Sequence, residues 1–152
     1  MEDQTTARAL RKMAGACNNS AAMYKDISKL TSSATVQEVT SKWAEECQEM
    51  RNRINELIRD HGGVPVHLED IDNILERMWL KYSDMLKDRT DETFIDICSE
   101  MERDNFETFK QVMDAHKDIS SNTIIKSLFN MISVRLGKLF DLKRHESGIP
   151  SD

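Results

Sequence analysis

Residues 36–65, VQEVTSKWAEECQEMRNRINELIRDHGGVP, decide the fold. Apolar side chains recur here at spacings of three and four, which places them on one face of an α-helix. The stripe lasts roughly seven turns and consists of Val36, Val39, Trp43, Cys47, Met50, Ile54, Leu57 and His61. The helix should end at Gly62-Gly63, where a glycine can take the left-handed conformation, and Pro65 prevents its continuation. The stretch therefore predicts one long amphipathic helix with a single buried face.

Four further segments show the same periodicity, at about residues 5–30, 71–86, 94–116 and 125–142. Ser33 or Thr35 can cap the second helix, and Thr90 or Asp91 the fourth. Short connections favour side-by-side, antiparallel packing of consecutive helices. We therefore expect an all-α protein with one bundle domain over residues 1–145 and a disordered C-terminal tail over residues 146–152.

Composition excludes several classes of protein. The net charge is −6 and no basic run occurs, which argues against a nucleic-acid-binding protein. No apolar run has the length needed to cross a membrane. The three cysteines are widely spaced and odd in number, which is typical of reduced thiols. These features predict a cytoplasmic protein without nucleic-acid or membrane partners.

Two cysteines should lie at one level of the bundle. Cys17 and Cys47 stand 15 residues before and after the turn near residue 32, and both fall on apolar stripes. Small, buried, soft apolar side chains are the simplest interpretation. A soft-metal site or a redox site on this pair is the alternative, although no histidine stands at ligand spacing.

The fourth segment carries the polar candidates for the interior. Asn105 is the clearly polar residue on its stripe, and we expect it to make a buried hydrogen bond that fixes helix register. Glu102 precedes it by the spacing of a Glu-x-x-His metal motif, with Asn in place of His. Met50 and Ile132 occupy the corresponding central positions of other helices, which predicts an apolar centre without a metal. The alternative ligand set is Glu102 with Glu46 or Glu49.

Three motifs resemble a known family. Gly62-Gly63-Val64-Pro65 ends a long helix, Arg77-Met78-Trp79 follows in the next, and an acidic helix with Phe109 comes after that. This order resembles a family of small bacterial ferritin-like bundle proteins of unknown function, over about residues 8–144. In that family Glu102 corresponds to a central glutamate, and Glu76 stands where histidine is common.

The resemblance implies a ferritin-like antiparallel four-helix bundle with an extra crossover helix. The first, second, fourth and fifth segments would form the bundle, and the third would lie in the crossover. Many relatives of this kind bind two metal ions between their helices.

Two functions follow as hypotheses. The first is a non-catalytic helical bundle, without cofactor, that acts through protein–protein contact or as a homo-oligomer such as a dimer. The broad apolar arc of the third segment makes Trp79 a candidate for the interface. The alternative is a metal-binding ferritin-like protein, either a di-metal carboxylate oxidase or a storage protein. A thiol sensor that uses Cys17 and Cys47 is a weaker third possibility.

Overall fold

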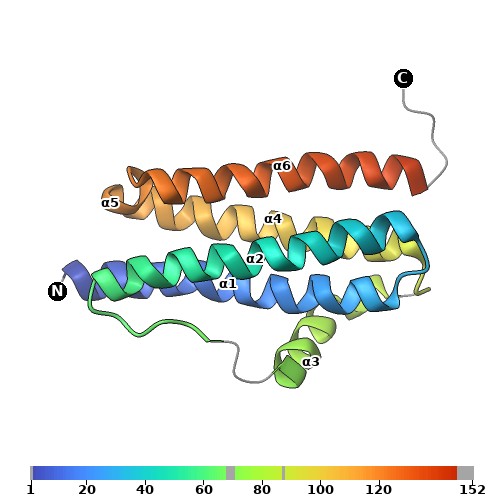
Figure 1. Cartoon of the computed structure of the whole chain (residues 1–152), viewed down its shortest axis with the longest axis horizontal. Coiled ribbons are helices and arrows are strands. Elements are labelled where there is room, and N and C mark those ends of the chain that lie inside the picture. The colour runs from blue at the N-terminus through green and yellow to red at the C-terminus, as the bar shows by residue number, and fades with distance from the viewer. Residues whose placement is uncertain (1, 68–70, 87, 147–152) are drawn as a thin grey trace.

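The structure is a computed structural model that describes residues 2–67, 71–86 and 88–146 (Figure 1). Four long helices dominate it, and three short helical elements join them. The long helices are α1 (Glu2–Leu30), α2 (Ala34–Asp60), α4 (Asp91–Ala115) and α6 (Thr123–Glu146). The short elements are α3 (Ile71–Lys81), the 3-10 turn η1 (Ser83–Met85) and α5 (Lys117–Ser120). No strand occurs among these residues, so the all-α prediction is confirmed.

Two boundaries differ from the prediction. The third helix ends at Lys81, and the apolar pattern beyond it continues through a 3-10 turn. The segment before the last helix, expected to be a break, contains the single helical turn α5, whose Ile119 is buried. The predicted disordered tail lies outside the described residues from 147 onward.

The four long helices lie side by side, and neighbours run in opposite directions (Figure 1). α1 packs against α2 and α4, and α6 packs against α4 and α2. The connection from α2 to α4 runs along the length of these helices, and within it α3 contacts α1. No helix of the described residues is long and apolar enough to span a lipid bilayer.

Local sequence explains where the helices begin and end. Ser33 caps α2, and its hydroxyl accepts a hydrogen bond from the Val36 amide at 3.2 Å. Thr90 caps α4 in the same way. Gly62 follows α2 with a φ of 75°, as predicted. Gly63 allows close approach to α1, because a Cβ at this position would lie 2.7 Å from the Cβ of Ala7.

The core consists of two apolar clusters that follow one another along the bundle. One contains Tyr24, Trp43, Cys47, Cys98 and Leu139 together with the inner face of α3. The other contains Cys17, Met50, Phe109 and Ile132 and reaches the α5 end. The boundary falls near the middle of every long helix.

Asp91 ties the turn between α1 and α2 to the start of α4. Its carboxylate accepts hydrogen bonds from the Thr31 hydroxyl, from the Ser32 amide at 3.0 Å and from the Ser32 hydroxyl at 2.7 Å. Burial is the largest single influence on the pKa of Asp91 and raises it, but the hydrogen bonds together lower it more, so that the pKa lies below its ordinary value. The charged form is therefore favoured by folding.

Replacing Asp91 should destabilise the protein in a pH-dependent manner. Asp91→Ala removes the bonds to Thr31 and Ser32 and should lower the free energy of unfolding by about 1 kcal/mol at pH 7. A lowered folded-state pKa stabilises above the unfolded pKa of about 4, and this stabilisation is lost as the pH falls through the folded value. Urea unfolding at pH 7 and near pH 3 should therefore show a difference from wild type that shrinks in acid. Asp141→Ala, on the exposed side of α6, is the control and should show no such trend.

Candidate functional site

A buried ion pair occupies the centre of the bundle. Glu102 on α4 is 0% exposed, and Arg135 on α6 is 2% exposed. The Arg135 Nε donates a hydrogen bond to the Glu102 Oε1 at 2.9 Å. Charged side chains are almost never buried to this degree unless they are paired. The expectation of an apolar centre is therefore wrong, because the central layer contains a complete ion pair.

α1 contributes a third partner. The hydroxyl of Tyr24, which is also fully buried, donates to the same Glu102 Oε1 at 2.5 Å. The Tyr24 ring packs edge-on against Trp43, with 5.6 Å between the ring centroids. These contacts fix the phenol, so that one carboxylate oxygen accepts two hydrogen bonds from two different helices.

α2 completes the group. The Arg135 Nη2 lies 3.3 Å from the Met50 sulfur, and its Nη1 lies 3.8 Å from the Glu46 Oε2. We call Tyr24, Glu46, Glu102 and Arg135 the central ionic cluster. Its members come from α1, α2, α4 and α6, one from each long helix, so the cluster links all four at one level.

Two atoms of the cluster retain unused hydrogen-bonding capacity. The Glu102 Oε2 and the Arg135 Nη1 are buried and have no hydrogen-bond partner among the described residues. Such atoms are costly in a low-dielectric interior, where a carboxylate or guanidinium prefers every position to be filled. They are complementary in type, since one accepts and the other donates.

The electrostatics of the cluster keep its arginine charged. Burial lowers the pKa of Arg135, but its electrostatic interactions with Cys47 and with the Glu102 carboxylate raise it more, so that it lies above its ordinary value. Burial and the negative charge of Glu102 raise the pKa of Tyr24 well above normal. Tyr24 is therefore a neutral hydrogen-bond donor.

All three cysteines surround this cluster as buried free thiols. Burial raises the pKa of Cys17 to about 12, with Arg135 opposing and Glu102 adding to the increase. Burial likewise raises the pKa of Cys47 well above normal and raises that of Cys98. Cys17 itself contributes to the increase at Cys47, but the two thiols belong to different apolar clusters, so their position in one layer stays a prediction. Thiols protonated in this way are poor nucleophiles.

Asn105 makes the predicted buried hydrogen bond. Its amide nitrogen donates to the Ser20 hydroxyl on α1 at 2.8 Å. Asn105 lies one turn beyond Glu102 on α4, so the polar part of the interior extends toward the α5 end. Its role in fixing helix register stays a prediction.

Two other predicted site residues lie away from the centre. Glu49 has a side chain that is 64% exposed, and it pairs with Arg53 on the same helix. The Trp79 indole nitrogen donates to Asp26 at 2.8 Å, and its ring packs against Phe94. Trp79 thus attaches α3 to α1 and α4 within the chain.

The carboxylates of the centre do not fit a di-metal site. Such a site needs carboxylates from all four helices and two histidines. Here Glu102 and Glu46 both face Arg135, and Glu49 points outward. Within the described residues no group of three or more His, Cys, Asp or Glu side chains could hold a metal ion.

Periodicity contained a signal for the missed arginine. Positions 125, 128, 132, 135, 139 and 142 alternate strictly by three and four, and this series includes Arg135. A stripe drawn from apolar residues alone takes Leu136 in place of Arg135, but the structure leaves Leu136 only half-buried. The series 95, 98, 102, 105, 109 and 112 includes Glu102 in the same way. A charged residue in each of two such series, with opposite signs, is the pattern that indicates a buried pair.

Breaking the central pair from one side should be strongly destabilising. Glu102→Gln keeps an acceptor for Tyr24 but leaves the buried Arg135 charge with Glu46, 3.8 Å away, in place of a directly bonded carboxylate, which should cost about 3 kcal/mol in urea unfolding. Glu100→Gln is the matched control on α4, because it removes an exposed pair with Arg103 and should cost less than about 0.5 kcal/mol. The double variant Glu102→Leu/Arg135→Met should recover much of the loss. Equal effects of the two single Gln variants would contradict a buried pair.

The thiols should be inert in the folded protein. With a pKa of about 12, only about one Cys17 thiol in ten thousand is ionised at pH 8. Iodoacetamide followed by intact-mass measurement should therefore show no labelling of the native chain and three labels after denaturation in urea. Rapid native labelling of Cys17 or Cys47 would instead support the thiol-sensor hypothesis.

Comparison with known proteins gives a family for this bundle. Residues 5–115 match a family described as "Domain of unknown function (DUF2383)". The matched segment carries Tyr24, Glu46 and Glu102, whereas Arg135 lies beyond it. No curated protein and no solved structure matches the chain. On the strength of a match over most of its length, the chain belongs to the DUF2383 family of domains of unknown function.

Proposed function

We propose that this protein is a non-catalytic, cytoplasmic helical bundle that acts through protein–protein contact. In this proposal the fold is ferritin-like, and an internal ion pair takes the place of the metal centre. The observation that carries the proposal is the position of the Arg135 guanidinium between the carboxylates of Glu102 and Glu46.

The guanidinium is a permanent occupant of that position. Arginine does not lose its proton in proteins, so Arg135 cannot become a neutral side chain that makes room for a cation. A divalent ion beside Glu102 would face this positive charge at close range in a low-dielectric interior. Arg135 therefore neutralises the charge of the carboxylates, as a metal ion would, but it supplies no Lewis-acid or redox activity.

The course of the chain supports the ferritin-like part of the proposal. A short turn joins α1 to α2, a short segment with the single helical turn α5 joins α4 to α6, and a longer connection that carries α3 joins the two pairs (Figure 1). One long crossover between two antiparallel pairs is the connectivity of ferritin-like bundles. The central ionic cluster likewise takes one inward-facing side chain from each long helix, as the carboxylates of such bundles do.

Burial argues against catalysis in the bundle centre. Tyr24 and Glu102 are fully buried and Arg135 nearly so, which leaves a substrate no route to them. In this proposal the activity is protein–protein contact, which uses side chains that face solvent. Val134 and Phe140 on α6 are each more than half exposed, and the proposal assigns this side of the bundle to contact with a partner.

Metal analysis tests the proposal against the metal-binding alternative. Protein purified without chelator should contain well under one iron, manganese or zinc ion per chain. Thermal unfolding should not shift on addition of these ions, whereas a site at one hundred times its Kd would stabilise the fold by about 2.7 kcal/mol, which corresponds to several degrees. Stoichiometric metal that is lost in Glu102→Gln but retained in Glu49→Gln would overturn the proposal and establish the alternative.

A further inference from the structure

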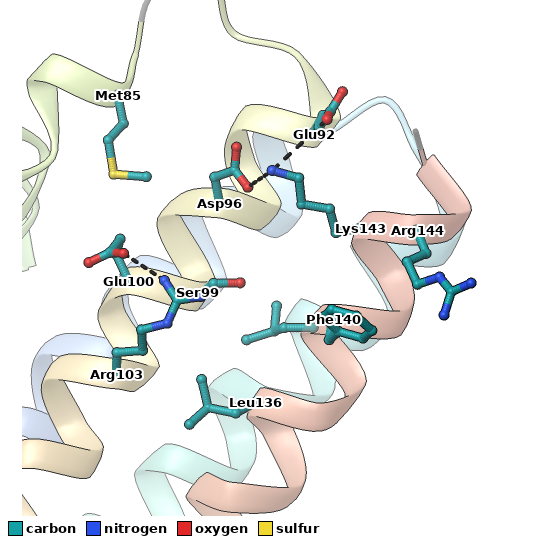
Figure 2. A pocket seen from close by; sticks show the side chains of 11 residues that line it. Met85, Glu92, Asp96, Ser99, Glu100, Arg103, Leu136, Phe140, Lys143 and Arg144 are labelled. Carbon is teal, nitrogen blue, oxygen red and sulfur yellow. Dashed lines mark hydrogen bonds and ion pairs between the residues drawn. The ribbon is translucent and has the colours of Figure 1, made fainter. Parts of the chain in front are cut away.

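A surface hollow lies between α4 and α6, next to η1 (Figure 2). Its volume is about 630 Å³. Met85, Leu136, Leu139 and Phe140 supply its apolar lining, and the small side chain of Ser99 lies on its α4 side. Phe140 is 64% exposed, so the hollow is accompanied by a projecting aromatic ring on the same surface.

The charges around the hollow are distributed unequally between the two helices, with an excess of acids on α4 and bases alone on the α6 side of the lining. Glu92, Asp96 and Glu100 line it from α4, while Lys143 and Arg144 line it from α6. Lys143 reaches across to pair with Asp96 and lies 4.0 Å from Glu92 (Figure 2). Arg103 on α4 pairs with Glu100 and brings the face to three acids and three bases. This face is thus neutral in a chain of net charge −6.

We propose that this α4–α6 face binds a second copy of the same chain about a twofold axis parallel to the helices. The inference rests on the proposed function and names the partner. A twofold interface brings each surface patch onto itself, so the patch must be complementary to its own copy. The α4 side of this face carries three acids and one base, and the α6 side carries two bases, so the face meets this requirement when α6 of one copy lies over α4 of the other.

Heights along the bundle support this arrangement. Rotation about an axis parallel to the helices does not change the position of a residue along the bundle. Residues of α4 and α6 that are level within one chain are therefore also level between the two copies. Lys143 is level with Asp96, and Arg135 is level with Glu102. Phe140, between them on α6, is therefore level with Ser99. The second copy's Phe140 would pack over Ser99 in the hollow, and its Arg144 would lie near Glu92.

Electrostatic repulsion favours this face over others. Two copies that each carry a charge of −6 repel one another, and a neutral, bipolar patch is where that repulsion is replaced by attraction. A basic or acidic foreign partner would match only one side of the hollow. A second copy matches both sides at once and also supplies the aromatic side chain that fits between them.

Concentration-dependent sedimentation tests the proposal. Wild-type protein should form a dimer between about 1 and 200 μM, and high salt should weaken it. Phe140→Glu places a negative charge against the α4 side, where acids are in excess, and should raise the dimer Kd at least about tenfold. Leu80→Glu on α3, where the leucine is 67% exposed, is the matched control and should leave the dimer intact. A wild-type chain that stays monomeric, or a dimer lost only in Leu80→Glu, would overturn the proposal.

A charge-exchange experiment checks the orientation. Arg144→Glu alone brings two acids together in a homodimer, and Glu92→Arg alone brings two arginines together. Both variants should therefore dimerise weakly, although a thermal scan should show that each is folded. Mixed together, they should form a heterodimer, because both of its contacts then join opposite charges. Failure to form heterodimers would overturn the twofold arrangement. A metal-containing dimer would refute only the proposed function, and a metal-free monomer would refute only this inference.

Discussion

The bond between Glu102 and Arg135 is the constraint on which the interior depends. Burial removes a carboxylate and a guanidinium from water, which costs free energy. Their attraction to each other offsets much of that cost. Because Tyr24 and Glu46 complete the group, all four long helices must keep their relative heights for the charges to remain paired. An apolar core could tolerate small shifts between helices, whereas this arrangement cannot. The pair therefore favours one arrangement of the bundle over its neighbours.

The same pair lies between the two apolar clusters of the core and close to three cysteine thiols that stay protonated. Apolar side chains collect on either side of the charged layer, which divides them into two clusters along the bundle. The thiols of Cys17, Cys47 and Cys98 lie in those clusters, and burial outweighs the favourable field of Arg135 at Cys17 and Cys47. The buried pair thus lies between the helices, and the thiols around it stay protonated.

The polar contacts outside the centre each join two segments, whereas the central ionic cluster joins all four long helices. Asn105 and Ser20 join α4 to α1, Asp91 joins the α1–α2 turn to α4, and Trp79 joins α3 to Asp26. Each connects segments separated by more than 50 residues. By contrast, no comparable interhelical hydrogen bond on the described part of α6 is as buried as that of Arg135. The position of α6, which also presents Phe140 and Arg144 to solvent, thus depends strongly on the central ionic cluster.

The sequence by itself determined the helices, because the information for them is local. Spacings of three and four predicted the four long helices, and cap residues and Gly62 predicted their ends within a few residues. It also identified Asn105 as a buried polar residue. What only the tertiary structure decided was the chemistry of the centre. Arg135 and Leu136 differ by one position, or about 100° around α6, and periodicity alone did not say which of them faces inward. That choice was decided by Glu102, 33 residues earlier on another helix, because a buried charge is stable only beside its partner.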